Sequence, residues 1–478
     1  MIALSLAELG RLVGGELHDA DPGAEVTGPA FLDTRTPEAG GLFVAFVGER
    51  ADGHDHAAAA VAAGAVAVLG TRPTGVPTVV VPDAQQALQQ LAREVLVRRR
   101  ALAAPLTVVA VTGSQGKTSA KDLLAHVLGG HAPTVATAGS FNNELGLPLT
   151  VLRLTGETRF LVLEMGARGL GHLTELCAIA PPDVALVLNV GKAHLGEFGS
   201  QQNIARAKGE IVAALDPATG TAVLNADDPL VTVMDERAPG AATRRFGRGD
   251  DADVRLEDVR LDDVGRPGFD LVADGVREHV QLRLLGAHQA TNAAAAAAVA
   301  LAAGLGLPEV AAGLRAVEHL SRWRMELAER ADGLVVVNDA YNANPDSMRS
   351  AVETLAGIGA RSGRRTVAVL GEMRELGPDA GAEHRAVGAL AARLGVDVVV
   401  VVGEGAAGTA AALHEAGHPA THQVRGVAEA SAWLRENVGG PDVVLVKASR
   451  SGRLEQVAQT LLEDVAPTAG ARGEEPRS

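Results

Sequence analysis

Short apolar runs alternate with amphipathic stretches through the middle of the chain. Runs of Val, Leu and Ala predict strands at 106–112, 160–164, 184–189 and 221–224, and the alanine-rich run 290–303 predicts a helix. Strands that alternate with helices are typical of a mostly parallel sheet. Because ligands of such sheets bind beyond the carboxyl ends of the strands, we look for chemistry there.

The parts before and after this region show the same alternation. In the first part, a helix at 57–64 lies among three apolar runs, which indicates a small α/β domain with strands at 42–47, 65–69 and 78–81. In the last part, each apolar run leads into a polar or glycine-bearing loop, which indicates a second doubly wound domain. Its predicted strands are 334–337, 366–370, 396–402 and 443–446.

We therefore predict an α/β protein of three domains, with bounds of 1–103, 104–318 and 319–464. A length of 478 residues fits two to four domains. The tail 465–478 lacks apolar periodicity, so we expect it to be disordered. The segment 93–104 is predicted to be a helix end and linker whose three consecutive arginines form a solvated face.

Composition narrows the class of protein. The chain is 47% hydrophobic but only 2% aromatic, which favours α/β layers built from Val, Leu and Ala. A net charge of −15 argues against a nucleic-acid surface. The single cysteine, Cys177, excludes an internal disulfide framework and fits a reducing compartment. No apolar stretch reaches the roughly 20 residues of a membrane span. We expect a cytoplasmic monomer.

A glycine-rich loop follows the predicted strand 106–112. Gly113 and Gly116 let backbone N–H groups turn toward an anion, Lys117 supplies a positive charge, and the Thr118 hydroxyl is suited to Mg²⁺. The candidate phosphate loop consists of Thr112, Gly113, Ser114, Gln115, Gly116, Lys117 and Thr118. It is a shortened form, since position 111 is Val rather than Gly. A plain glycine turn is the alternative, and the flanking strand and helix favour the phosphate site.

Two further strand ends carry polar side chains toward the same edge. Glu164 ends the strand 160–164, within reach of a Mg²⁺ held by Thr118, and His194 follows the strand 184–189. Lys208 lies on a predicted helix after His194. Taken alone, it fits an exposed lysine paired with a nearby acid.

Lysine is scarce in this chain, which gives the few lysines more weight. Of 43 basic residues only five are lysine, and we suggest that these are kept where a compact or deprotonatable amine is needed. They are Lys117, Lys121, Lys192, Lys208 and Lys447.

Other polar loops are candidates for ligand contacts. Asn142 and Asn143 lie in one such loop, and His288 and Asn292 share a face of the alanine-rich helix. The loop 338–345 contains the chain's single tyrosine beside an aspartate, which favours a ligand loop over a plain turn. A dinucleotide-like glycine pattern at 403–408 lacks the acidic residue about 20 positions later, so an NAD site is disfavoured.

With these motifs the chain resembles the Mur ligases, the ATP-dependent amide-forming enzymes of peptidoglycan synthesis. The family's shortened loop is similar to 112–118, its metal-binding residues to Thr118, Glu164 and His194, and its carbamylated lysine to Lys208. The resemblance assigns Asn292 to adenine, Arg324 to phosphate and Asp339 to ribose. It implies substrate contacts from Thr34, Arg35, Asn142, Asn143, Tyr341, Asn344, Lys447, Ser449 and Arg450. Gln289 and Ala448 depart from the family pattern.

The resemblance also implies the reaction. ATP would activate the carboxylate of a UDP-N-acetylmuramoyl-tripeptide as an acyl phosphate, and D-alanyl-D-alanine would then attack it, with Lys117, His194, Lys208 and Arg324 as catalytic residues. Two Mg²⁺ ions are implied, together with a UDP-binding N-terminal domain, an ATP-binding central domain and a Rossmann-like C-terminal domain. Two alternatives stay open: a related ligase that adds an amino acid or a glutamate, and a nucleotide switch without enzymatic activity.

Overall fold

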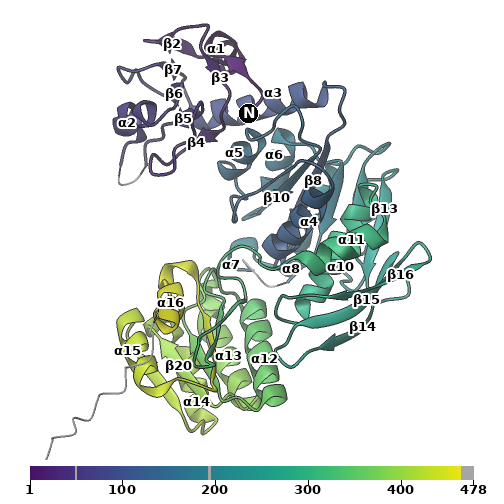
Figure 1. Cartoon of the computed structure of the whole chain (residues 1–478), viewed down its shortest axis with the longest axis vertical. Coiled ribbons are helices and arrows are strands. Elements are labelled where there is room, and N and C mark those ends of the chain that lie inside the picture. Colours follow the sequence, from purple (N-terminus) through teal and green to yellow (C-terminus); the bar gives the residue numbers. More distant parts are fainter. Residues whose placement is uncertain (49–50, 192–194, 464–478) are drawn as a thin grey trace, which may run out of the picture.

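Three large β-sheets, each covered by helices, follow one another along the chain in this computed structural model (Figure 1). The structure describes residues 1–48, 51–191 and 195–463. The N-terminal and C-terminal parts lie at opposite ends of the long axis, with the central part between them. The predicted α/β class is confirmed. No helix within these described ranges has the length and hydropathy to cross a membrane.

The N-terminal part holds a five-stranded sheet in the order β2-β7-β6-β5-β4, in which only β2 is antiparallel to its neighbour. A separate pair, β1 and β3, lies beside α1. The elements are β1 (Leu4–Ser5), α1 (Leu6–Val13), β2 (Glu16–His18), β3 (Glu25–Val26), β4 (Ala30–Phe31), β5 (Leu42–Val44), α2 (Ala57–Ala62), β6 (Ala67–Gly70), β7 (Thr78–Val80) and α3 (Ala84–Arg100).

The central part holds a nine-stranded sheet in the order β16-β15-β14-β13-β12-β11-β8-β10-β9. The strands are β8 (Thr107–Thr112), β9 (Thr134–Ala136), β10 (Phe160–Glu164), β11 (Val184–Val187), β12 (Thr221–Asn225), β13 (Ala242–Gly247), β14 (Val254–Leu261), β15 (Pro267–Ala273) and β16 (Val276–Gln281). The helices are α4 (Lys117–His131), α5 (Gly146–Val151), α6 (His172–Ile179), α7 (Leu195–Phe198), α8 (Gln201–Lys208), α9 (Glu210–Ala213), α10 (His288–Ala302) and α11 (Leu307–Ala316).

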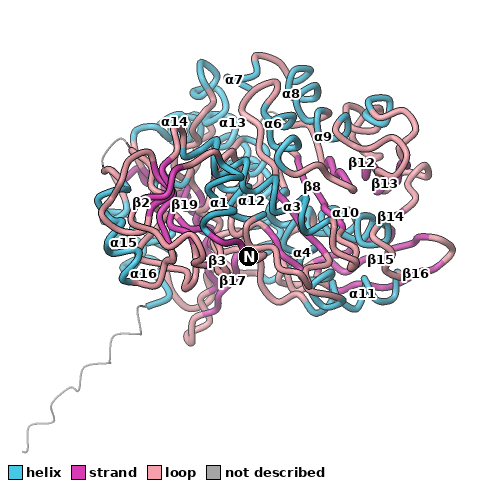
Figure 2. Tube along the Cα trace, turned by 90° about the horizontal axis from the view of Figure 1, so that it is seen from above, coloured by secondary structure: helices cyan, strands magenta, loops and turns pink. Residues whose placement is uncertain are grey.

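The C-terminal part holds a six-stranded sheet in the order β17-β18-β22-β19-β20-β21, parallel except for β17. Helices cover both faces of this sheet, as the predicted doubly wound arrangement requires (Figure 2). The elements are β17 (Glu326–Glu329), β18 (Val335–Asn338), α12 (Pro345–Ser362), β19 (Thr366–Leu370), α13 (Ala380–Arg393), β20 (Val398–Val402), α14 (Ala407–Glu415), β21 (Thr421–Val424), α15 (Val427–Asn437), β22 (Val443–Lys447) and α16 (Glu455–Glu463).

Two local features of the central part differ from the sequence prediction. Strands β14, β15 and β16 form an antiparallel extension that the strand-helix alternation did not predict. The helix after the glycine loop also continues through Gly129 and Gly130, where we expected a C-cap, to His131. It ends there because Ala132 precedes Pro133, whose ring disfavours a helical residue before it, and Ala132 is extended at φ −156°.

The structure corrects the prediction that all three arginines at the end of α3 form a solvated face. Arg99 is fully buried rather than solvated. Its guanidinium donates to the carbonyl oxygens of Ala104 at 2.8 Å, Pro105 at 3.3 Å and Thr158. A buried arginine persists here because those carbonyls give its N–H groups partners.

The same helix joins the N-terminal part to the central part. Leu88, Leu91 and Val95 of α3 belong to one apolar core that also contains Leu147 and Leu161 of the central part. These two parts are therefore held together by a shared core.

We expect Arg99→Met to destabilise the protein, because three carbonyl oxygens lose their donor and one of them, that of Thr158, is in a buried contact. The loss should be on the order of 3 kcal/mol, measured as a lower midpoint of urea unfolding. Arg98→Met is the matched control. Arg98 is partly exposed and makes a 3.5 Å ion pair with Glu8, so its loss should cost less than about 1 kcal/mol. Equal effects of the two variants would contradict the assigned role of Arg99.

Candidate active site

The predicted phosphate loop connects the carboxyl end of β8 to the start of α4. Gly116 has φ +80°, and a Cβ at this position would lie 2.6 Å from Oδ1 of Asn292. Glycine is required for both reasons, the left-handed backbone and the close approach of α10. Asn292 is itself held by Gln289, which accepts its Nδ2–H at 3.0 Å. The loop and α10 therefore form one assembly.

Asn189, which follows β11, holds the loop in shape. Its Oδ1 accepts from the backbone N–H groups of Ser114 and Gln115, both at 3.0 Å, and its Nδ2 donates to the Gln115 carbonyl at 3.1 Å. We assigned no role to Asn189 from the sequence, although it stands at the end of a predicted strand. Its position at the end of a strand was the feature of the sequence that could have pointed to this role.

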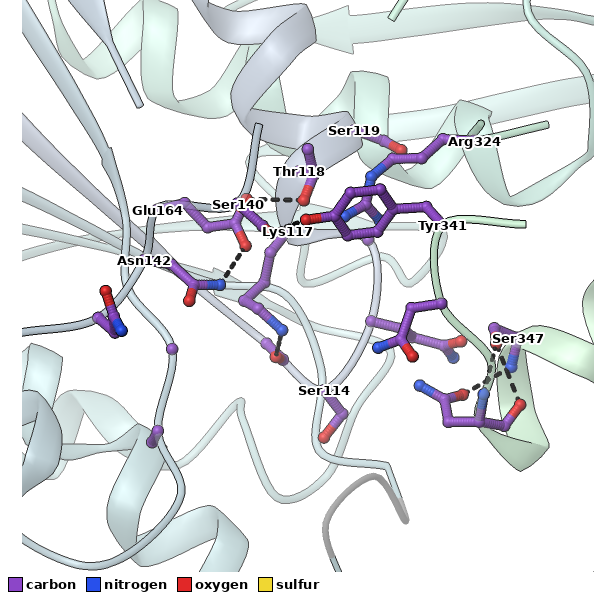
Figure 3. Close-up of a pocket in the computed structure, with 18 of the residues that line it drawn as sticks. Ser114, Lys117, Thr118, Ser119, Ser140, Asn142, Glu164, Arg324, Tyr341 and Ser347 are labelled. Atoms are coloured by element: carbon purple, nitrogen blue, oxygen red, sulfur yellow. Dashed lines mark hydrogen bonds between the residues drawn. The ribbon is translucent and has the colours of Figure 1, made fainter. Parts of the chain in front are cut away.

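Thr118, Glu164 and Asn142 form a hydrogen-bonded chain at the sheet edge. The Thr118 hydroxyl donates to one carboxylate oxygen of Glu164 at 2.7 Å, and Asn142 Nδ2 donates to the other at 2.7 Å (Figure 3). The Glu164 side chain is buried. The expected meeting of the loop hydroxyl with the strand-end carboxylate is thus present in the structure.

Three basic side chains face the same space. Burial lowers the pKa of Lys117, and Arg324 lowers that pKa further while Glu164 opposes the change. The pKa of Lys208 lies well below its ordinary value, because of burial first and the nearby charge of Lys117 second. Lys117 Nζ donates to the Gly113 carbonyl at 2.9 Å. The charges of Lys117 and Arg324 are suited to an anion such as a phosphate group, whereas burial favours the neutral form of Lys208.

These residues line one cavity of about 960 Å³, whose walls come from the central part, the C-terminal part and helix α3. The candidate residues that line it are Gly113, Ser114, Gln115, Gly116, Lys117, Thr118, Asn142, Asn143, Glu164, Lys208, Asn292, Arg324, Asp339, Tyr341, Asn344 and Lys447. Glu210, an acid two residues after Lys208, does not pair with it and instead accepts from the backbone N–H groups of Gly171 and Thr174, before and within α6. Within the described ranges no side chain pairs with the Lys208 amine.

Five candidate residues are not among those that line the cavity. Thr112 donates its hydroxyl proton to the Met165 carbonyl at 3.0 Å. Thr34 and Arg35 lie in the N-terminal part, where Arg35 forms a two-pronged ion pair with Asp33. Ser449 and Arg450 lie behind the cavity in loop contacts: Ser449 Oγ accepts from Arg374 N at 3.0 Å, and Arg450 pairs with Glu455 at 2.7 Å.

Two lining residues in the C-terminal part have their polar atoms engaged within the protein. Asn344 is the N-cap of α12, accepting from the backbone N–H of Ser347 at 2.9 Å. Lys447 Nζ donates to Asp339 Oδ2 at 2.6 Å, to the Asn342 carbonyl at 2.9 Å and to the Asp339 carbonyl at 3.5 Å.

His194 and Lys192 lie outside the described residues, so their predicted places at this edge stay predictions. Of the side chains that the structure does describe, no three His, Cys, Asp or Glu gather as a metal cluster.

Comparison with known proteins agrees with this geometry. Residues 15–107 match the Mur ligase family catalytic domain, 111–300 the Mur ligase middle domain, and 323–450 the Mur ligase glutamate ligase domain. The chain is 46% identical to the UDP-N-acetylmuramoyl-tripeptide–D-alanyl-D-alanine ligase of Mycobacterium tuberculosis, with 97% of this chain and 98% of that protein aligned.

Solved structures of MurF ligases are also similar to this chain in sequence and in fold. MurF from Acinetobacter baumannii is 32% identical with a TM-score of 0.83, over 97% of this chain and 99% of that one. The MurF ligase from Thermotoga maritima, solved in complex with ADP, is 31% identical with a TM-score of 0.76, over 92% and 98%. Sequence, fold and the cationic cavity at the sheet edge therefore lead to one conclusion: this chain belongs to the Mur ligase family.

Proposed function

We propose that this protein is an ATP-dependent ligase that joins D-alanyl-D-alanine to UDP-N-acetylmuramoyl-tripeptide, giving the UDP-linked pentapeptide, ADP and phosphate. The observation that carries the proposal is the single cavity in which Lys117, Lys208 and Arg324 surround the Thr118–Glu164 pair. The relatives that bear this activity in their names align over nearly the whole chain. The loop from Asp339 to Pro345 contributes Asp339, Tyr341, Asn342 and Asn344 to the lining of this cavity.

The phosphates of ATP are assigned to the loop 112–118. The positive end of α4, which begins at Lys117, is suited to an anion, and Lys117 and Arg324 add full charges. Asn292 is assigned to adenine and Asp339 to ribose. Phosphoryl transfer needs little covalent chemistry from a protein, so these residues act by holding the reactants in line and neutralising charge.

Mg²⁺ is suited to the side chains present. Its preferred ligands are oxygen atoms, and Thr118 offers a hydroxyl within 2.7 Å of the Glu164 carboxylate. A bound Mg²⁺ supplies positive charge to phosphate oxygens. We propose two such ions, with His194 and a carbamylated Lys208 as further ligands.

Lys208 has the environment that carbamylation needs. Burial beside Lys117 favours the neutral amine, which is the form that adds CO₂. The nitrogen lone pair forms a bond to the carbon of CO₂. The electrons of one C=O π bond move onto its oxygen, which becomes a carboxylate oxygen, and the nitrogen releases a proton. The carbamate is an oxygen ligand, which an arginine cannot provide.

The reaction proceeds in two steps. The terminal carboxylate of the tripeptide attacks the γ-phosphorus, and the bond to the oxygen of ADP breaks. The amine of D-alanyl-D-alanine then attacks the acyl carbon of the resulting acyl phosphate, phosphate leaves, and the nitrogen loses a proton. We propose that Asn142, Asn143 and Tyr341 contact these substrates, with Asn344, Ser449 and Arg450 shaping the loops around them.

The three parts of the chain divide this work. We propose a UDP-binding domain over 1–103 with Thr34 and Arg35 as contacts, an ATP-binding domain over 104–318, and a ligase domain over 319–464. We propose that the protein acts as a monomer, because all the assigned residues come from one chain.

We expect ADP release only when ATP, UDP-N-acetylmuramoyl-tripeptide and D-alanyl-D-alanine are all present. A coupled ADP assay with each substrate omitted in turn tests this, with mass spectrometry of the UDP-linked product. Turnover with a single amino acid but not with the dipeptide would indicate another ligase of the family. ATP binding without substrate-dependent ADP release would indicate a nucleotide switch.

We expect Lys208→Arg to keep the positive charge and yet lose at least about 100-fold in kcat, because guanidinium does not form a carbamate. The wild type should lose activity when CO₂ and bicarbonate are removed, and regain it when bicarbonate returns. Arg206→Lys, a change at an exposed position on the same helix, is the matched control and should leave kcat within about threefold. Full turnover by Lys208→Arg in CO₂-depleted buffer would overturn the assigned carbamate.

A further inference from the structure

Arg324 lies in an unusual bend where the chain enters the C-terminal part. Trp323 has φ +62° and Met325 has φ +51°, so a left-handed residue flanks Arg324 on each side. Large side chains rarely adopt this conformation, and the two together store strain that the surroundings must hold.

The bend aims Arg324 at the phosphate loop. Its guanidinium carbon lies 4.2 Å from the centre of the Tyr341 ring, which supports it by a cation–π contact. The side chain reaches over the start of α4 beside Thr118 and Ser119 (Figure 3). Its charge is close enough to lower the pKa of Lys117. The direction of the Arg324 side chain therefore depends on the backbone of 323–325.

Asp339 clamps this bend from the neighbouring strand end. Its Oδ1 accepts from the backbone N–H of Met325 at 3.1 Å, and the Tyr341 N–H donates to the Trp323 carbonyl at 3.2 Å. The other carboxylate oxygen of Asp339 accepts from Lys447 Nζ at 2.6 Å. An aspartate held on both oxygens has a fixed orientation, and so does the amide that it binds.

Lys447 has no donor left for a substrate. An ammonium group has three N–H bonds, and those of Lys447 are directed at Asp339 Oδ2 and at the carbonyls of Asn342 and Asp339. The side chain is 2% exposed. Its geometry is that of a clamp rather than of a ligand contact.

We propose that Lys447 is a positioning residue for Arg324: through Asp339 it holds the left-handed bend 323–325 that directs the guanidinium to the nucleotide phosphates. This inference rests on the proposed function, since it takes ATP as the ligand of the phosphate loop. Without the clamp the bend relaxes toward ordinary backbone angles, and Arg324 moves away from the site.

The test compares glycine with alanine at position 323, with and without Lys447. Trp323→Gly and Trp323→Ala remove the same indole, but only glycine takes φ +62° without strain. When Lys447 is present, the clamp holds the bend, so kcat/KM for ATP should differ between the two variants by no more than about threefold. In a Lys447→Met background, kcat/KM for ATP should be about tenfold or more higher in the glycine variant than in the alanine variant.

Controls separate positioning from general stability. Asp19, exposed and also left-handed at φ +52°, lies in the N-terminal part, so Asp19→Gly and Asp19→Ala should not differ in activity in the Lys447→Met background. Thermal unfolding of every variant reports folding separately. If Lys447→Met does not fold, Asp339→Asn weakens the same clamp while keeping an acceptor for Met325, and the same glycine-to-alanine ratio is measured there.

Equal ratios in the two backgrounds would overturn the proposal, as would full activity of Lys447→Met. The failure of the proposed function would look different: the wild type would then release no ADP with the peptide substrates. In that case the affinity of the same variants for a fluorescent ATP analogue reports the ratio. An unchanged ratio in that binding measurement would also overturn the role of Lys447.

Discussion

The structure depends on positive charge gathered in one place. Lys117 of α4 and Arg324 of the bend before β17 meet at one cavity, which Glu164 at the end of β10 also lines. Lys208 of α8 lines the same cavity, and its burial favours the neutral amine. Burial and mutual repulsion make the charged lysines costly, which is why the pKa values of Lys117 and Lys208 are lowered. An anionic ligand relieves that cost. The site is therefore arranged for a highly charged phosphate, and the fold must hold it together when the ligand is absent.

The fold holds this site together by close packing of small residues around the phosphate loop. Parallel strands bring Thr112, Glu164 and the residues after β11 to the same edge of the sheet. The alanine-rich helix α10 packs close to that edge because its side chains are small, which places Asn292 against Gly116. A larger residue at position 116 would push α10 away and remove the loop from its support.

The sequence allowed the fold class, most strand positions and the placement of Thr118 and Glu164 at one sheet edge to be predicted, because these follow from apolar periodicity and from the rule that ligands lie at strand ends. It did not allow the role of Asn189 or the burial of Arg99 to be predicted. In both cases the partners are backbone groups, some of them in distant segments, and the sequence does not show where a backbone group will lie. Lys447 was recognised as unusual because lysine is rare here, but its three acceptors became visible only in three dimensions.

The two interfaces between the three parts differ in composition. Helix α3 shares one apolar core with the central part, so separating the two would expose buried side chains to water. The C-terminal part meets the central part through Leu285, which joins the C-terminal apolar core, and through polar contacts such as Ser321 N to Asp122 at 2.8 Å and Ser350 to His288 at 3.0 Å. Water replaces such bonds at small net cost. The chain crosses from the central part to the C-terminal part at residues 321–325, which carry Arg324. The place of the guanidinium at the phosphate loop is therefore set by the way the C-terminal part sits against the central part.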